Sequence, residues 1–147
     1  MKKGLRRVLD VRRLLEDRAT HDLEIKAAEL RRLEALVQEH SEIVAETRNA
    51  TVQRMLNESA GDCWLAMADA DLLSWKRDRL QTAAQKVNEE VVGLAEHRMS
   101  RRMERQQTEA LVTKAAEAHE KERIRRDQQK TDEWFQNLRS SGSRRSE

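Results

Sequence analysis

The chain has 147 residues, of which 37% are hydrophobic and 38% are charged, and its formal net charge at pH 7 is +2. This small apolar fraction argues against a thick globular core, although the length suits one domain. The sequence contains no proline, four glycines and one phenylalanine, a composition that is typical of long helices and argues against β-strands. We therefore expect an all-α fold with a thin core between two helices.

The first predicted element is a long helix from about residue 5 to residue 56. Apolar residues recur along it at alternating spacings of three and four, which is the pattern of a coiled-coil seam. The members of this stripe are Val8, Val11, Leu15, Ala19, Leu23, Ala27, Leu30, Leu33, Val37, His40 and Val44, with Leu36 and Ile43 widening the face. Charged residues occupy the other faces, so we expect those faces to be solvated.

Residues 57–62, with the sequence NESAGD, form the predicted turn. Gly61 can supply a left-handed helix cap, and Asp62 can cap the helix that follows. We expect the chain to fold back here, so that residues 1–139 form a single antiparallel coiled-coil hairpin. A turn near Ala70 is the alternative and would make the arms equal in length. The helical ladder that continues from Leu65 through Trp75 argues against it.

The second predicted helix runs from about residue 63 to residue 138. A heptad pattern covers its first part, with Leu73, Leu80, Val87 and Leu94 spaced by seven and Arg77, Ala84 and Val91 at the four-residue offsets. The apolar pattern then continues through Met99, Met103, Ala110 and Leu111. This change of spacing predicts one stutter near Arg98.

The end of this second helix has no predicted partner. Folding at residues 57–62 places Leu5 opposite about Ala115, which leaves about 23 residues to project on the order of 35 Å at a rise of about 1.5 Å per residue. We expect this part to overhang as a single helix. The Ser-rich and Gly-containing tail, residues 140–147, is predicted to be disordered.

The charges are distributed unevenly along the chain. Residues 1–13 contain six basic residues and one acidic residue, and residues 98–147 contain thirteen basic and nine acidic residues. The two segments between them, residues 14–62 and 63–97, carry net charges of −5 and −2. Folding back would therefore gather both basic segments at one end of the hairpin and the acidic segments toward the turn.

The sequence shows no catalytic or metal-binding pattern. The four histidines, His21, His40, His97 and His119, do not lie at metal-ligand spacing with one another or with Cys63, and no glycine-rich phosphate loop is present. A two-helix rod offers no pocket that would desolvate a pair of carboxylates. We expect neither an enzyme nor a cofactor nor a small-molecule substrate, and we expect His40 to be a partly buried seam residue.

The sequence favours a cytoplasmic location. No segment approaches the roughly 18 to 20 apolar residues that span a bilayer, and the first residues lead into a basic segment and not into the apolar core of a signal peptide. Cys63 is the only cysteine, so no intramolecular disulfide can form, which suits a reducing compartment.

Two groups of residues are candidates for partner binding. The first is the N-terminal basic cluster, which consists of Lys2, Lys3, Arg6, Arg7, Arg12 and Arg13. It could dock on a protein, bind nucleic acid or lipid, or simply be solvated, and its lack of aromatic residues argues against nucleic acid. Trp134 and Phe135 lie on the predicted overhang, where no first-arm residue can cover them, which favours contact with a partner.

The second group lies at the predicted turn. Trp64 and Trp75 are eleven residues apart, about three helical turns, and so share one face, with Met55 and Leu56 arriving from the other arm. These side chains either staple the hairpin closed or form a surface for a partner, because exposed tryptophan is enriched at binding hot spots.

Both ends of the chain resemble a known family. Residues 5–12, LRRVLDVR, followed by Glu16, and residues 125–133, RRDQQKTDE, resemble the ends of the flagellar FliJ proteins and their injectisome homologues of the YscO type. The resemblance covers almost the whole chain in architecture, through short motifs. It implies a non-enzymatic stalk and escort component of a bacterial type III protein export apparatus, flagellar or injectisome.

The resemblance also implies partners and roles for individual residues. The implied fold is an antiparallel hairpin similar to the rotor stalk of F- and V-type ATPases. It would insert into the hexameric export ATPase and link it to the export-gate membrane protein and to export chaperones. The implied location is the cytoplasm, peripheral at the inner membrane. Residues at the ATPase ring would be Arg6, Arg7, Arg12, Arg13, Trp134 and Phe135. Residues facing the export gate would be Met55, Leu56, Trp64 and Trp75, although the family is expected to carry smaller aromatic residues there.

Two other functions compete with this interpretation. One is a generic coiled-coil adaptor or secretion chaperone that pairs through an exposed seam. The other, which the sequence supports less, is a nucleic-acid-binding helical protein.

Overall fold

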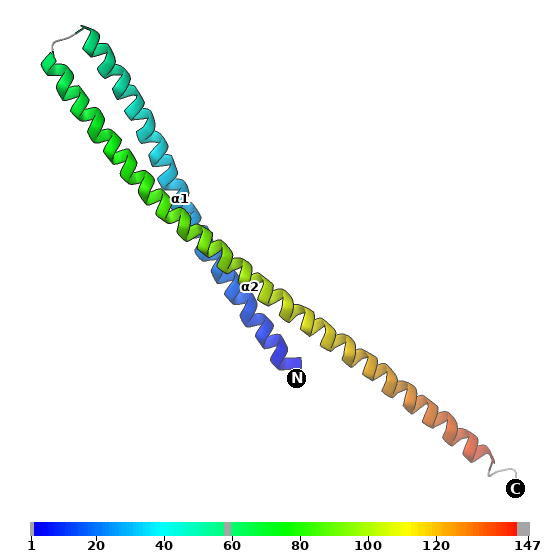
Figure 1. Ribbon diagram of the computed structural model, residues 1–147. Coiled ribbons are helices and arrows are strands. Elements are labelled where there is room, and N and C mark those ends of the chain that lie inside the picture. Colours follow the sequence, from blue (N-terminus) through cyan, green and yellow to red (C-terminus); the bar gives the residue numbers. More distant parts are fainter. Residues whose placement is uncertain (1, 58–59, 144–147) are drawn as a thin grey trace. The chain divides into compact units, whose positions relative to one another are not determined.

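The computed structural model describes residues 2–57 and 60–143, with side chains for residues 3–57 and 61–140. It contains two α-helices, α1 (Lys2–Asn57) and α2 (Ala60–Ser143) (Figure 1). The helices pack against each other, which confirms the predicted all-α helical hairpin. Within the described ranges, neither helix has a stretch long and apolar enough to cross a membrane.

The chain divides into two compact units. The first, which we call the turn unit, is Leu15–Arg101, and the second, the termini unit, is Met1–Leu14 together with Arg102–Glu147. In the turn unit, Lys26 Nζ lies 2.9 Å from Glu90 Oε2 and Arg48 Nη2 donates to Ser74 Oγ at 3.0 Å. As residue numbers rise along α1, the numbers of the contacted residues on α2 fall, so the two helices run antiparallel.

The core of the turn unit is a thin seam with a regular heptad pattern. Its buried apolar members include Ala19 and Val44 from α1 and Ala84 and Val87 from α2. Half-buried residues fill the intervening seam positions, which are Leu23, Leu30, Leu33, Val37 and His40 on α1 and Leu73, Arg77, Leu80, Val91 and Leu94 on α2. No described side chain is fully enclosed, as expected for only two helices.

The first part of the predicted stripe on α1 is wrong by one residue. Val8 and Val11 are 47% and 55% exposed, whereas Leu9 is buried and Leu5 and Arg12 are half-buried. Counting back in sevens from Ala19 leads to Arg12 and Leu5 and not to the two valines. The heptad spacing therefore holds its register in α1, and a charged residue is accepted where its aliphatic stem can pack.

The predicted stutter near Arg98 is also wrong. Met99 and Met103 are 55% and 54% exposed and Leu111 is 56% exposed, so none of them enters the seam. The seven-residue spacing continues along α2 through polar residues instead, which are Arg98, Arg101, Arg105 and Thr108, followed by Val112 and Ala115. Long arginine stems can fill seam positions while their charged ends leave the interface, so the helix keeps its register without an apolar stripe.

The break between the two helices lies inside the predicted turn, but residues 57 and 60–62, which the sequence pattern assigned to the turn, are helical. The break falls between Asn57 and Ala60, and the predicted turn residues 58 and 59 lie outside the described residues. Gly61 is helical, with no positive φ, and Asp62 lies in the first turn of α2 and not at its cap. An acidic side chain in that turn interacts favourably with the positive end of the helix dipole. The alternative turn near Ala70 is excluded, because Ala70 is buried within α2.

In the termini unit, α2 continues beyond the last residue that α1 covers. From residue 116 to residue 140 every side chain is exposed except that of Glu122, which is half-buried. The helix extends to Ser143, so the prediction of a disordered tail is wrong for residues 140–143, and residues 144–147 lie outside the described part. The sequence has no proline that would stop the helix before this point.

Candidate functional site

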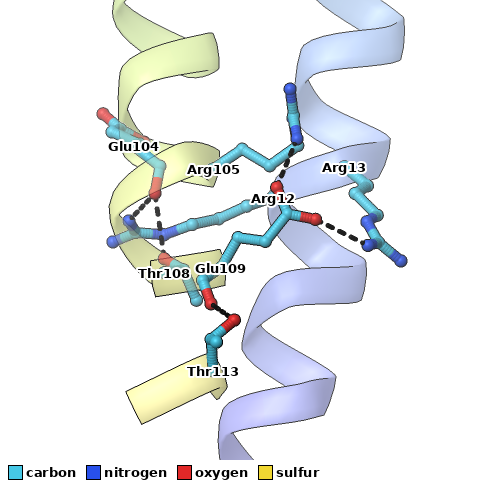
Figure 2. A network of polar contacts seen from close by, with 7 residues as sticks. All are labelled: Arg12, Arg13, Glu104, Arg105, Thr108, Glu109 and Thr113. Carbon is cyan, nitrogen blue, oxygen red and sulfur yellow. Dashed lines mark hydrogen bonds and ion pairs between the residues drawn. The ribbon is translucent and has the colours of Figure 1, made fainter. Parts of the chain in front are cut away.

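The predicted ring-binding arginines divide into two pairs with different surroundings. Arg12 and Arg13, from α1, point toward α2 and are engaged there (Figure 2). Arg12 Nη1 donates to the main-chain carbonyl oxygen of Glu104 at 2.6 Å, and Arg13 Nη2 lies 3.1 Å from Glu109 Oε1. These two arginines therefore hold the N-terminal part of α1 on α2 and are not free for a partner in this arrangement.

Glu109 lies at the centre of this polar network. Its carboxylate accepts from Arg13 on α1 and, at 2.8 Å, from Arg105 Nη1 on α2 (Figure 2). The side chains of Arg13 and Glu109 are 52% and 43% exposed, so each such pair contributes only about 0.2–1 kcal/mol. In the termini unit, α1 is consequently held on α2 by several weak, salt-sensitive polar contacts. Leu5 and Leu9 add a small apolar interface.

Arg6 and Arg7 differ from this pair because both are exposed. Arg6 borders a small hollow whose other lining residues are Leu5, Val112, Ala115 and Ala116. The hollow forms because two alanines on α2 leave space opposite Leu5. Neither arginine is ion-paired within the described part of the chain, so of the four predicted ring-binding arginines these two can meet a partner.

Trp134 and Phe135 lie on the uncovered end of α2 in the termini unit. Their rings touch edge to face, with centroids 5.1 Å apart and an interplanar angle of 72°. They remain 59% and 55% exposed. A fixed aromatic pair without cover is an apolar surface of the kind that partners use.

The four residues predicted at the turn lie in the turn unit and are all exposed. Leu56 and Trp64 are 74% and 73% exposed, and Met55 and Trp75 are 46% and 53% exposed. The seam beside them is built from the small buried residues Cys63, Ala66 and Ala70. Small residues bring the helices close together and leave no room for an indole, so the tryptophans lie outside the seam and do not staple the hairpin.

Trp75 contacts Arg79 on its own helix. The guanidinium carbon of Arg79 lies 4.9 Å from the ring centroid, a cation–π contact that fixes the orientation of the indole. Sequence reasoning missed Val52, Leu65 and Met67, which are also exposed near the turn. The heptad on α2, extended from Leu73 back to Ala66, places Leu65 and Met67 off the seam, and the heptad on α1, extended from Val44 to Thr51, does the same for Val52.

The described residues include no candidate metal centre. No group of three or more His, Cys, Asp or Glu side chains among them could hold a metal ion. Lys26 donates hydrogen bonds to the carboxylates of Glu90 and Glu29, and these bonds, with that to Glu90 first, raise the pKa of Lys26 to about 12. The ion pair with Glu90 links α1 to α2 on an exposed surface. This ion pair holds the two helices together in the turn unit.

Comparison with protein-family models, with curated proteins and with solved structures gives no match to this chain. The assignment of a function therefore depends on the residues and their surroundings.

Proposed function

We propose that this chain is a non-enzymatic stalk and escort component of a bacterial type III protein export apparatus, flagellar or injectisome. In this role it inserts into the hexameric export ATPase and links that ring to the export gate and to export chaperones. The observation that carries the proposal is the uncovered end of α2 with its exposed Trp134 and Phe135, in the same unit as the exposed Arg6 and Arg7. The terminal motifs that resemble the FliJ and YscO families support it.

The two kinds of exposed residue suit different parts of ring binding. Charged side chains such as Arg6 and Arg7 attract an acidic ring lumen over several ångströms without fixing one register, which a rotating or rocking stalk requires. Trp134 and Phe135 supply short-range apolar contact. In this proposal Arg12 and Arg13 act indirectly, because they hold α1 in place on α2.

The exposed residues near the turn are the proposed contact with the export gate. Met55, Leu56, Trp64 and Trp75 present flexible and aromatic apolar side chains to solvent, and such residues are frequent at binding hot spots. The protein would then lie in the cytoplasm and be held peripherally at the inner membrane by its protein partners.

The decisive experiment is reconstitution with the hexameric export ATPase from the same genome. We expect complex formation in analytical gel filtration and a change in ATPase rate, both weakening as salt rises. The double variant Arg6→Glu/Arg7→Glu should weaken binding by about tenfold at low salt, as expected for the loss of steering charges. Arg31→Glu/Arg32→Glu is the matched control, because these adjacent arginines are exposed on α1 within the turn unit.

Two results would contradict the proposal. One is the absence of any complex between the wild-type chain and the ATPase, and the other is an equal loss of binding in the test and control variants. A generic coiled-coil adaptor or secretion chaperone could use the same exposed residues near the turn, and it would bind an export substrate without binding the ATPase. Salt-titrated DNA binding tests the nucleic-acid alternative, which requires measurable affinity at low salt.

A further inference from the structure

His40 is a titratable side chain on the seam of the turn unit. It is half-buried there, whereas His21 and His97 of the same unit are exposed. Its Nδ1 atom is enclosed and has no hydrogen-bond partner among the described residues. The residues one helical turn away from it on α1 are all apolar, namely Leu36, Val37, Ile43 and Val44. On its own helix, the ring of His40 therefore has only apolar neighbours along the seam.

A printed contact near the turn sets the register between the two helices around His40. Arg48 Nη2 donates to Ser74 Oγ at 3.0 Å, which places these two residues side by side. One heptad earlier on α1 and one heptad later on α2, the same register places Ser41 opposite Gln81. His40 directly precedes Ser41, so it faces the two seam residues that come just before Gln81 on α2.

The charged residues that α2 brings to this place are basic. The two seam residues are Leu80 and Arg77, and Lys76 flanks them. Arg77 is half-buried, and its guanidinium already binds the nearest carboxylate, that of Asp78, with Nη2 and Nε at 2.7 and 2.9 Å from Oδ1. The seam opposite His40 consequently offers one aliphatic side chain and two cations.

A proton on His40 is unfavourable in these surroundings. A neutral imidazole carries one N–H and leaves its other nitrogen bare, whereas an imidazolium carries a donor on both. The second donor here is the enclosed Nδ1, and a buried donor without an acceptor destabilises the packed state. The positive charge also faces Arg77 and Lys76, which repel it. The acidic residues nearest in sequence on α1, Glu39 and Glu42, are exposed and lie off the seam.

We propose that His40 makes the packing of the turn unit sensitive to acid. As the pH falls from about 7.5 to about 5.5, within the range in which imidazole side chains gain a proton, the seam around His40 opens. The open form lets the ring meet water and accept the proton, so protonation shifts the equilibrium toward it. This inference goes beyond the export assignment and does not depend on it, because it follows from the surroundings of one seam residue.

Native-state hydrogen exchange of the full-length chain tests the inference without the ATPase. Protection factors, which remove the effect of pH on the intrinsic exchange rate, are compared at pH 7.5 and pH 5.5. We expect the amides of residues 36–44 to lose about tenfold in protection at the lower pH, as one buried donor without an acceptor implies. Residues 5–14 of the termini unit should keep their protection.

Two glutamine variants assign the effect to one histidine. His40→Gln keeps a polar side chain that cannot gain a proton in this range, so it should abolish the loss of protection. His97→Gln makes the same change at an exposed position of the turn unit and should leave the loss as it is in the wild type.

Arg77→Glu tests the cause by reversing the charge opposite His40. A protonated imidazole would then find an acceptor across the seam, so the protection of residues 36–44 should rise as the pH falls. The variant also removes the ion pair between Arg77 and Asp78. The sign of the pH dependence within the variant is still informative, because both measurements lack that ion pair.

Four results would overturn the inference. They are constant protection of the wild type across this pH range, an equal loss in His40→Gln, the disappearance of the loss in His97→Gln, and a loss in Arg77→Glu as large as in the wild type. Because no partner takes part in this experiment, its failure leaves ring binding to be judged by the reconstitution.

Discussion

Arg12 of α1 donates a hydrogen bond to the main-chain carbonyl oxygen of Glu104 on α2, at 2.6 Å and across 92 residues of sequence. The same oxygen accepts from Thr108 Oγ1 at 2.9 Å (Figure 2). A carbonyl within a helix already has a backbone partner at its usual position, so Arg12 supplies an additional donor. A charged residue thus occupies the seam of the termini unit and joins its two helices.

Replacing Arg12 with alanine should loosen the N-terminal part of α1. The change removes both the packed aliphatic stem and the bond to Glu104, and we expect a cost of about 1 kcal/mol. Hydrogen exchange of the amides of residues 5–14 should accelerate, while exchange in the turn unit stays the same. Arg31→Ala is the control, since Arg31 is exposed, and equal acceleration in both variants would refute a seam role for Arg12.

Gly61→Ala should stabilise the protein by about 0.5–1 kcal/mol. Gly61 is helical with no positive φ, and an added Cβ would meet nothing within 4 Å, so alanine gains helix propensity without strain. Gly93, which is also open and helical, is the matched control and should give a similar gain. A rise in Tm for Gly93→Ala together with a fall for Gly61→Ala would indicate that Gly61 adopts the left-handed cap conformation that the sequence suggested.

Arg98→Leu should raise the melting temperature. Arg98 lies half-buried at a seam position, and its Nε is enclosed without a hydrogen-bond partner. An apolar side chain removes that unsatisfied donor and buries its methyl groups in the seam, with an expected gain of about 1 kcal/mol. Arg102 is exposed, so Arg102→Leu should change the Tm little. Thermal unfolding by circular dichroism makes the comparison, and lower stability for Arg98→Leu would be the contrary result.

The tryptophans and alanines near the turn should respond in opposite ways. Trp64→Ala is expected to change the free energy of unfolding by less than about 0.5 kcal/mol, because the indole is exposed. Ala70→Leu should cost about 1–3 kcal/mol, because the buried methyl group leaves no room for a larger side chain. Urea unfolding of both variants measures this difference, and a large loss for Trp64→Ala would show that the indole packs in the core.

The ion pairs of Lys26 predict a change in stability at high pH. Its pKa is raised from 10.5 to about 12 by Glu90 and Glu29. A raised pKa means that the folded state holds the proton more tightly, so the stabilisation is complete below about 10.5 and is lost as the pH rises toward 12. Lys26→Met cannot titrate and is the control. Urea titrations between pH 9 and pH 12 should show that the wild type's higher free energy of unfolding falls toward that of this variant. A difference in the free energy of unfolding that stays constant with pH would refute the prediction.

The sequence by itself determined the helices, the antiparallel fold and the position of the turn. Residue composition and heptad spacing are local properties, and a helix of this length follows from them without long-range information. The exposure of Trp134 and Phe135 also followed, because the first arm is too short to reach them.

Only the tertiary structure decided which residues of each heptad enter the seam. Val8 and Met99 look like seam residues by hydrophobicity, yet Arg12 and Arg98 occupy the seam instead. The physical reason is that two packed helices share one register, which the better packed part of the pair imposes on the rest. That register also determines that Arg12 and Arg13 are engaged on α2 while Arg6 and Arg7 remain accessible, a distinction that a run of basic residues in a sequence does not contain.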